Sequence, residues 1–569
     1  MAFAIETPHA AIKIWNYVDR VSDTGALAEH ANQVKEEIIS TLSLTSINTS
    51  KSKGDPVGSF NFTLAPTRNW VSVITPGSWC VILMSNEPIT KASFAKPDKS
   101  LVKMFGRIDT VRVEVSVGED GARNTRYLVA GQDWGSMFNN VFYVDPLVND
   151  PSDTQGKQGN ALFVQIVKNL LSKNNTPSTF SIKGNLQSLL SVFGEPLSLP
   201  ETTRIAKPTH NIAIPREART YFGFIDAQGT PSSSTDLTKI VTLQTGALNT
   251  GDEGVYDTNI NDGNGWLDPF SMVGQHTLWS LLMDNCNYAL NEVYPEMRWL
   301  NDDSPQLTLY SRIKPFSFQD EPISDIDTQL RAKFQNVKTH RLNDDTIFSV
   351  NAGTNWKDKF NFIEIKPEMS EFKVYDIAVK LKSQAYQKEP GGAAKTDVFD
   401  REGFRPLIYS IKQIPLQVGS ETADKFDVEV LNKWVNMLQE WYFDTHRLLN
   451  GQLSMTGSSE YIPVGDNVLF DAELVGVSHN YNSAALEKKK CLVLAHVESV
   501  QHSFSVNSEG AREFKTTIQF TRGIIVDESK KLIGGGTIDT LSTSLSKLGS
   551  RNSITTVSTA TSDDPDKGK

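Results

Sequence analysis

Two glutamates at helical spacing are the first candidates for chemistry. Glu292 and Glu296 stand four residues apart in a segment whose apolar pattern predicts a helix, so both carboxylates would share one face. Paired carboxylates can serve as acid and base in sugar cleavage. The chain holds 67 Asp and Glu residues, however, so one such pair is expected by chance. A solvated helix face is therefore favoured over a catalytic pair.

One loop has the residue types of a calcium site. Between Asp257 and Gly263 oxygen side chains alternate along the chain, and Asp268 falls at the twelfth position. Two features depart from a calcium loop: Asp262 stands where the sharp-turn glycine is expected, and Asp268 is shorter than the usual glutamate. An Asn/Asp/Gly turn is favoured, and neither a metal nor a cofactor is predicted.

The nine histidines contain no pair four residues apart. His446 and Asp444 would point to different sides of a predicted helix, because they are two residues apart. His496 and His502 flank one predicted strand, where packed and hydrogen-bonded rings are favoured over catalytic ones. Phosphate-loop, zinc-helix and nucleophile-elbow motifs are absent from the sequence. We therefore predict no catalytic, cofactor-binding or metal-binding residue, and we expect the chain not to be an enzyme.

The cysteines and the charge exclude further classes of site. Cys80, Cys286 and Cys491 are odd in number and lack C-x-x-C spacing, so we predict buried thiols instead of disulfides or a zinc site. A net charge of −11 argues against a surface that grips nucleic acid. The one tight basic run, 488–490, is interpreted as a solvated hairpin tip.

Neither export nor membrane insertion is expected. Residues 1–11 lack the basic start and apolar run of a secretory signal. The sequence holds no run of about 18 consecutive apolar residues, the length that a helix needs to cross a bilayer.

A few helices are predicted to position these residues. Periodic apolar patterns predict helices over the ranges 23–44, 161–172, 185–193, 275–300 and 422–449. Asn450 and Gly451 would cap the last helix. Polar residues 45–55 predict a linker, and the Gly/Ser/Asn-rich range 226–265 predicts long loops around a few short strands.

Strands dominate the rest of the chain. Alternating valines from Val111 to Val117 predict a half-buried strand, followed by a turn at 118–121 and a return strand toward Trp134. Further strands are expected at 307–312, 468–480, 491–506 and 514–526. In the last of these, apolar and polar residues alternate from Phe514, so one face should meet a core.

Three groups of motifs resemble one known family. The first is residues 75–82 (TPGSWCVI) with 104–108 (MFGRI), and the second is the range 277–294 followed by 307–309 (LTL). The third is 450–453 (NGQL), 464–468 (VGDNV) and 475–479 (VGVSH). In this order they are similar to the baseplate central hub proteins of contractile-tailed phages. The polar range 226–265 departs from that family.

The resemblance implies an α+β, predominantly β fold with two tail-tube-like β-barrel domains, helical insertions and a flexible C-terminal tail. The implied segments are an N-terminal helical segment and linker, a first barrel with a helical insertion, a middle α+β domain, a second barrel with a long helix, and the tail. Their ranges are 1–54, 55–215, 216–329, 330–533 and 534–569.

The resemblance also implies a role. It predicts a homotrimer that joins a sixfold tail tube to a threefold spike and encloses a channel for DNA in transit. The implied partners are the tail tube or tube-initiator protein and the central spike, with the tape measure and baseplate wedge proteins as further candidates. The implied location is the virion baseplate, assembled in the host cytoplasm.

Two other functions stay open from the sequence. One is a tail-associated cell-wall hydrolase that uses Glu292 and Glu296. The other keeps the architecture but places it in a phage-derived secretion or bacteriocin machine.

Overall fold

The structure is a computed structural model of the 569-residue chain. It describes residues 7–17, 34–117, 121, 123–140, 142–143, 214–224, 241–245, 276–277, 279–280, 283, 291–299, 305–314, 337–367, 403–411, 438, 441–442, 445–458, 460–477 and 491–526. Among these residues no helix is long and apolar enough to cross a membrane.

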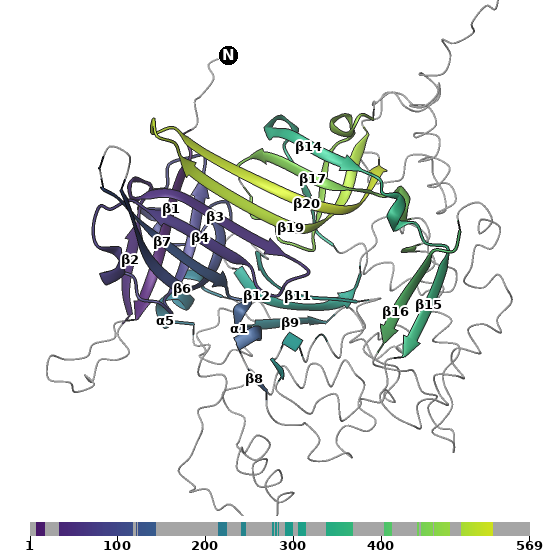
Figure 1. The fold of residues 1–569 in the computed structure, drawn as a ribbon, viewed down its shortest axis with the longest axis horizontal. Coiled ribbons are helices and arrows are strands. Elements are labelled where there is room, and N and C mark those ends of the chain that lie inside the picture. The colour runs from purple at the N-terminus through teal and green to yellow at the C-terminus, as the bar shows by residue number, and fades with distance from the viewer. Residues whose placement is uncertain are drawn as a thin grey trace, which may run out of the picture.

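One large sheet organises the described residues (Figure 1). Its main path runs β14-β17-β20-β19-β3-β4-β7-β6-β5-β1-β2, and the pair β13–β18 joins it through β19. The strands are β1 (His9–Tyr17), β2 (Val34–Ile39), β3 (Leu44–Ser52), β4 (Ser59–Leu64), β5 (Trp79–Ser85), β6 (Val102–Val117), β7 (Arg123–Asp133), β13 (Thr339–Arg341), β14 (Ile347–Gly353), β17 (Leu449–Thr456), β18 (Asn467–Asp471), β19 (Leu492–Val506) and β20 (Arg512–Val526). The predicted predominantly β fold is confirmed.

The N-terminal half, β1 to β7, curls around its own core. Ile47 of β3 and Ile12 of β1 belong to the same buried cluster, although four strands separate β3 from β1 along the sheet. Side chains from all seven strands of this half belong to the cluster, so one face of the sheet encloses a single core. Side chains of β5 alternate between two cores, since Ile82 points into this cluster and Val81 into a second one on the other face.

The C-terminal half, β13, β14 and β17 to β20, has a separate core. Leu453, Val468 and Ile518 come from three of its strands and are fully buried together. The long hairpin of β19 and β20 also reaches beyond this core, because Phe504 and Phe514 near its tip pack into the N-terminal cluster. Each half therefore has its own apolar centre, and one hairpin contributes to both.

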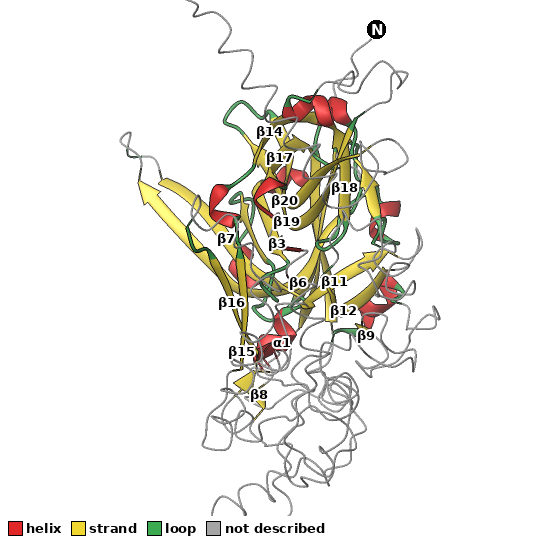
Figure 2. Cartoon of the chain, turned by 90° about the vertical axis from the view of Figure 1, so that its right-hand side faces the viewer, coloured by secondary structure: helices red, strands yellow, loops and turns green. Residues whose placement is uncertain are grey.

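The halves are joined by a strand-to-strand ladder. β3 pairs antiparallel with β19, from Ser46 opposite Ser505 to Ser52 opposite Ser499. In Figures 1 and 2 the long strands β19 and β20 run beside β3, so the two halves form one continuous surface. Buried Lys103 adds a second connection, since its Nζ donates to the Ser458 carbonyl at 2.8 Å.

A smaller sheet packs against both halves. It has the order β11-β12-β9, formed by β11 (Asn291–Trp299), β12 (Pro305–Ile313) and β9 (Val241–Thr245). Val293 of β11 enters the second cluster of the N-terminal half, and Tyr294 enters the C-terminal core. Pro295 is tolerated because β11 is an edge strand.

The remaining described elements are short. Two-stranded sheets join β8 (Phe142–Tyr143) with β10 (His276–Thr277), and β15 (Phe362–Pro367) with β16 (Pro406–Ile411). Helix α1 (Ser136–Asn140) follows β7, and helix α5 (Arg216–Phe222) covers the N-terminal half with Phe222 against Phe105. The 3-10 turns are η1 (Thr41–Ser43), η2 (Trp70–Ser72), η3 (Ala92–Phe94), η6 (Asp344–Thr346), η7 (Trp356–Asp358), η9 (Thr445–Arg447) and η10 (Ala472–Val475).

The predicted helix over 23–44 and linker over 45–55 are wrong where the structure describes them. Residues 34–39 form β2, which pairs with β1 from Tyr17 opposite Val34 to Ile12 opposite Ile39. Residues 44–52 form β3, at the centre of the large sheet. Ile47 and Thr49 are buried there, so pairing on both sides outweighs the polar composition of this stretch.

The predicted helix over 275–300 is wrong from residue 291 onward, because 291–299 is β11. The backbone is helical at residues 279, 280 and 283, as predicted. The pattern misleads because residues four apart share one face of a strand as well as of a helix.

The end of the predicted helix over 422–449 is also wrong. Residues 438, 441 and 442 are helical, but Asn450 and Gly451 do not cap a helix and instead lie inside β17.

Several strand predictions are confirmed. The hairpin of β6 and β7, the strand at 307–312 and the hairpin of β19 and β20 lie where they were expected. Along β20, Phe514 and Ile518 are buried while Gln519 is exposed. The expected half-buried face at Val113 is wrong, since Val113, Val115 and Val117 are 50%, 48% and 70% exposed.

The other expectations for 161–172, 185–193, 488–490 and 534–569 lie outside the described residues, as does nearly all of 226–265 apart from β9.

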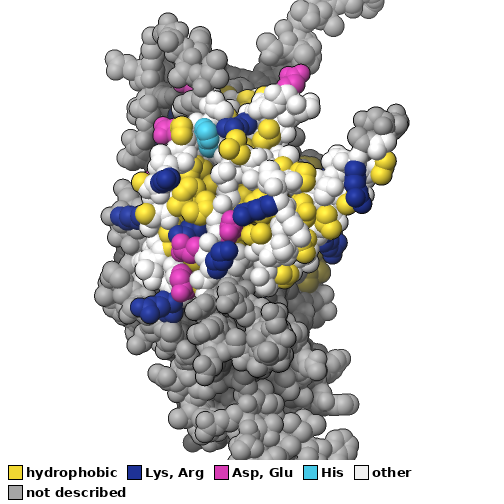
Figure 3. Space-filling view, turned by 90° about the vertical axis from the view of Figure 1, so that its left-hand side faces the viewer, with side chains coloured by type: hydrophobic (Ala, Val, Ile, Leu, Met, Phe, Trp, Pro, Cys, Tyr) yellow, Lys and Arg dark blue, Asp and Glu magenta, His cyan; other side chains and the backbone are white. Residues whose placement is uncertain are grey.

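Exposed apolar side chains accumulate on the N-terminal half. Figure 3 shows the β1–β2 end of the molecule, where hydrophobic atoms cover wide areas broken by Lys and Arg side chains. The large apolar residues exposed in this half are Ile38, Leu42, Val71, Val113, Val115 and Val117. Apolar patches on a protein surface can mark contact sites.

Candidate functional site

Buried charges gather where β3, β11 and the C-terminal strands meet, and we call this cluster the polar junction. Its members are buried or partly buried, and each has an ionic or hydrogen-bonded partner from another element. They are Lys51, Lys53, Asp133, Glu292, Glu296, Arg298, His340, Tyr461, Asp466, His496, Glu498 and Arg522.

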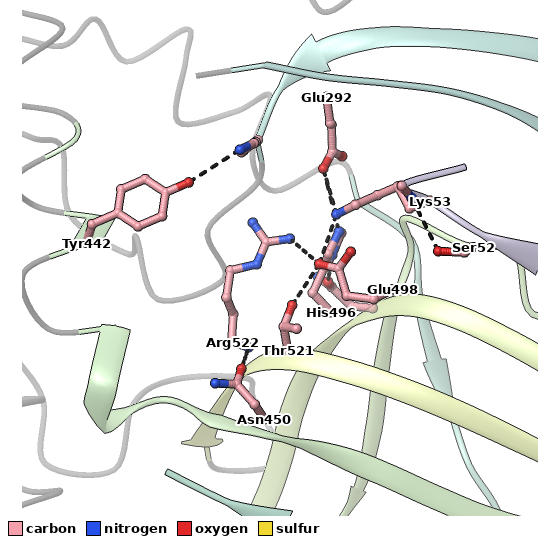
Figure 4. A network of polar contacts seen from close by, with 12 residues as sticks. Ser52, Lys53, Glu292, Tyr442, Asn450, His496, Glu498, Thr521 and Arg522 are labelled. Atoms are coloured by element: carbon pink, nitrogen blue, oxygen red, sulfur yellow. Dashed lines mark hydrogen bonds and ion pairs between the residues drawn. The ribbon is translucent and has the colours of Figure 1, made fainter. Parts of the chain in front are cut away.

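Lys53 stands at the centre of one part of the junction (Figure 4). Its Nζ lies 2.8 Å from Glu292 of β11 and 3.0 Å from Glu498 of β19. Its backbone N–H also donates to the Glu498 carbonyl at 2.8 Å. Lys53 directly follows β3, so one cation connects the N-terminal half, the small sheet and the C-terminal half.

Glu498 receives further partners from β20. The Thr521 hydroxyl donates to Oε1 at 2.8 Å, and the Arg522 guanidinium lies 3.5 Å from the same atom. Burial raises the pKa of Glu498, but Lys53 and Arg522 outweigh that effect and hold the pKa below its usual value. Glu498 is therefore held in its charged form.

Local irregularities in β19 and β20 direct the side chains of Glu498 and Arg522 into the junction. The pairing of β19 with β20 shifts register between Leu494 and His496 and again between Val497 and Ser499. Arg522 has a φ of 55°, in the left-handed region, and its N–H donates to the Asn450 side chain at 3.1 Å. β-Bulges change the direction of side chains in this way, so that polar groups point into an otherwise apolar region.

Glu296 forms a second part of the junction. Its Oε1 accepts from the Tyr461 hydroxyl at 2.6 Å and from the Met297 N–H, and its Oε2 accepts from the Val464 N–H at 3.0 Å. Burial raises the pKa of Glu296 to about 7 and outweighs the opposing effects of Lys51 and these donors. The carboxyl group therefore titrates near neutral pH while it holds residues 461–464 against β11.

The third part connects β11 to β13. The Asp466 carboxylate pairs with Arg298 through Oδ1 and with His340 Nε2 through Oδ2, the latter at 2.9 Å. Gly465 precedes it with a φ of 82°, and the nearby Tyr294 ring leaves no room for a Cβ there. The Gly-Asp turn noted in the sequence thus places a buried carboxylate between two strands.

The fourth part of the junction is a buried pair within the N-terminal half. Lys51 of β3 contacts the Asp133 carboxylate of β7, which also accepts from the Gly135 N–H at 3.0 Å. Burial raises the pKa of Asp133, against the opposing effect of Lys51.

The contacts of the polar junction hold the two halves and the small sheet together. Every carboxylate oxygen named above for Glu296 and Asp466 faces a donor, and Glu292 and Glu296 are 6% and 3% exposed. A sugar or peptide would have to displace these partners before it reached either group. Among the described residues, no group of three or more His, Cys, Asp or Glu side chains is arranged to hold a metal ion.

The structure brings together some of the residues singled out in the sequence. Glu292 and Glu296 lie on the same face of β11, as their spacing required, but this face is buried and the prediction of a solvated helix face is wrong. His496 lies 3.9 Å from Glu292, and its Nδ1 is hydrogen-bonded to Asn467 at 3.0 Å.

The other singled-out residues lie elsewhere. His502 is buried and hydrogen-bonded to Thr516, and burial lowers its pKa well below the usual value, so the ring is neutral. His446 lies against the Trp356 ring, with Asp444 outside the described residues. Cys80 and Cys491 are buried thiols, as predicted, whereas Cys286 and the loop from Asp257 to Asp268 lie outside the described residues.

Most of the polar junction was missed from the sequence. Lys51 and Lys53 fell in the supposed linker, and Glu498 and Arg522 fell within predicted strands and were not singled out. The available signal was a charged residue at a position in phase with buried neighbours, such as Lys51 two residues after buried Thr49.

Comparisons with known proteins find similar solved structures. No family model matches the chain, and no curated protein matches it. The tail protein from Neisseria meningitidis MC58 is similar with a TM-score of 0.37 and 9% identity, over 90% of this chain and 96% of that one. The 43 kDa tail protein of prophage MuSo2 from Shewanella oneidensis gives 0.35 and 11%, over 90% and 98%. The half-lidded Francisella PdpA-VgrG complex gives 0.34 and 7%, over 94% of this chain and 60% of that one.

Proposed function

We propose that the chain is the structural hub of a contractile phage tail baseplate and that it has no enzymatic activity. In this role three copies join a sixfold tail tube to a threefold spike around a channel for DNA. The proposal rests on the ordered motifs at 75–108, 277–309 and 450–479 and on the arrangement of the two halves.

One observation carries the proposal. A single chain holds two curled β halves with separate cores, which are fused side by side through the β3–β19 ladder. Three such chains would place six halves around one axis while keeping threefold symmetry. A ring of this kind could meet a sixfold tube on one side and a threefold spike on the other.

The surface and the polar junction support the same role. Exposed apolar side chains of the N-terminal half, from Ile38 to Val117, are available for a contact between subunits (Figure 3). The polar junction fixes the two halves and the small sheet relative to one another, which a ring subunit requires. The proposed partners are therefore other copies, the tube or tube-initiator protein and the spike, within a virion baseplate assembled in the host cytoplasm.

The mass of the purified protein in solution tests the proposal. Size-exclusion chromatography with light scattering should give three chains of 63.1 kDa, about 190 kDa, and electron micrographs should show a threefold ring with a central hole. A persistent monomer at high concentration would contradict the proposed hub.

The absence of enzymatic activity has its own test. Glu292 is ion-paired with Lys53 and Glu296 is saturated with donors, so purified cell walls should survive incubation with the protein. Wall cleavage that is lost on Glu292→Gln would instead establish the hydrolase.

A further inference from the structure

A lysine and an aspartate of the N-terminal half meet across a glycine. Extended by one residue, the β3–β4 and β4–β7 pairings align Lys51, Gly58 and Asp133 in one row across three strands. The outer two backbones of such a row are two strand spacings apart, about 10 Å. A Cβ on Gly58 would lie 2.9 Å from Lys51 Cδ and 3.0 Å from Asp133 Oδ2. The missing side chain of Gly58 therefore lets the other two side chains reach each other.

The pair is enclosed, and its atoms are held in place by backbone groups. The side chains of Lys51 and Asp133 are 10% and 5% exposed. Lys51 Nζ contacts Asp133 Oδ2 and donates to the Pro56 carbonyl at 3.3 Å, while Asp133 Oδ1 accepts from the Gly135 N–H at 3.0 Å. Burial raises the pKa of Asp133, which favours the uncharged acid. Water has little access to either group.

We propose that Lys51 and Asp133 condense to an amide that links β3 covalently to β7. A proton first passes from Lys51 Nζ to Asp133 Oδ2, which leaves an uncharged amine in contact with an uncharged acid. The Nζ lone pair attacks Cγ and forms the new C–N bond. The Cγ–Oδ2 bond then breaks, and Oδ2 leaves as water with its own proton and a second proton from Nζ. The condensation needs no oxidant, reductant or further reactant.

Three features of the site favour the amide. Groups held in contact react with effective concentrations of about 10⁵ to 10⁸ M, far above those of free solutes. The Gly135 N–H faces Asp133 Oδ1, the oxygen on which negative charge develops in the tetrahedral intermediate. The low exposure of both side chains keeps out the water that would hydrolyse the product. The bond forms once in each chain, so it is a modification of the protein and not turnover of a substrate.

Mass spectrometry of the denatured full-length protein tests the bond. After overnight incubation at neutral pH, the main species should be lighter than the unmodified chain by the mass of one water molecule. Trypsin should release residues 36–53 joined to residues 127–157, without cleavage after Lys51. Lys51→Arg keeps the positive charge but removes the amine, so it should show the full mass and two separate peptides. Lys35→Arg, at an exposed position of β2, is the control and should lose water as the wild type does.

Each outcome decides the proposal. A wild-type chain that keeps its full mass overturns it. A loss of water that persists in Lys51→Arg also overturns it, because the loss then comes from another reaction, such as imide formation at an aspartate. If Lys51→Arg does not fold, fragmentation of the joined wild-type peptides locates the bond, and any position other than Lys51 and Asp133 contradicts the assignment. The mass of a denatured chain does not depend on oligomeric state, so the test stands apart from the hub proposal.

Discussion

At the scale of residues, the polar junction replaces apolar contact by paired charge at the point where three parts of the chain meet. Buried ion pairs add little net stability over apolar packing, but removing one partner is expensive. Their directionality also fixes one arrangement. Lys53 contacts both Glu292 and Glu498 only when the end of β3 lies between β11 and β19.

Removal of the central cation should be costly. Lys53→Met removes the Lys53 cation from buried Glu292 and from partly exposed Glu498, which keeps Arg522, so we expect a loss of about 3 to 5 kcal/mol in the free energy of unfolding. Thermal unfolding followed by circular dichroism measures the change. Lys35→Met, at an exposed position of β2, is the matched control and should leave the midpoint unchanged. An equally small effect of both variants would show that the junction does not hold the halves together.

Glu296 should make stability depend on pH. Its pKa rises from 4.5 to about 7 on folding, so the folded state binds more protons between these values. The contribution of this group is full below pH 4.5 and is lost as the pH rises through 7, a difference of about 3 kcal/mol. Glu296→Gln removes the titration and keeps one acceptor oxygen, so it loses one of the hydrogen bonds from Tyr461 and Val464 at a cost that does not depend on pH. The variant should therefore gain stability relative to the wild type between pH 5 and pH 8.

The control for this pH series is Glu509→Gln, at an exposed position. The difference between its thermal midpoint and that of the wild type should be the same at every pH. Thermal midpoints at pH 5, 6, 7 and 8 give the comparison. A Glu296→Gln curve parallel to that of the wild type would contradict the role assigned to burial.

At the scale of elements, close approaches of strands leave little room for additional atoms. Gly457 follows β17, donates its N–H to the Phe514 carbonyl at 2.8 Å, and accepts from the Asn86 side chain at 3.2 Å. A Cβ on Gly457 would lie 1.8 Å from the Phe514 ring. This glycine lets the end of β17 approach both the β19–β20 hairpin and the N-terminal half.

Gly457→Ala should therefore destabilise the protein. Phe514 is buried in the N-terminal cluster and cannot move freely, so we expect a loss of about 1 to 3 kcal/mol. Gly353→Ala on β14 is the matched control, because a Cβ there meets nothing within 4 Å. The thermal midpoints of the two variants test this prediction. Equal midpoints would contradict the close packing of Gly457 against Phe514.

The sequence predicted the long hairpins but not the joints between halves. Alternation in β20 is a local pattern, and it identified the strand and its buried face correctly. The strand β3 could not be identified in this way, because its partners β4 and β19 supply the burial and β19 lies far away in the sequence. Glu292 and Glu296 were singled out by their spacing, yet their burial depends on the contacts of β11 with both halves.

At the scale of the whole molecule, the outer part of the β6–β7 hairpin is available for contacts between copies. Val113, Val115 and Val117 are exposed on one side of β6, and their removal should leave the fold of a single chain intact. In the proposed trimer they contribute to the subunit interface.

Replacement of all three valines by threonine separates folding from assembly. We expect an unchanged far-ultraviolet circular dichroism spectrum and a smaller trimer fraction in light scattering at the same protein concentration. Exposed Phe404, beside the β15–β16 sheet, is the control, and Phe404→Ser should not alter the trimer fraction. An unchanged trimer fraction in the valine variant would exclude this hairpin from the interface.

The β3–β19 ladder has a consequence for synthesis on the ribosome. Ser52 pairs with Ser499, so roughly 450 residues must emerge before β3 gains this neighbour. At bacterial elongation speeds of about 5 to 20 residues per second, the waiting time is roughly 20 to 90 s. Throughout that interval the nascent chain presents an unsatisfied row of amides and carbonyls, a template for wrong pairing between neighbouring polysomal chains. Slow translation of this message should therefore increase aggregation, and chaperones that shield nascent strands should suppress it.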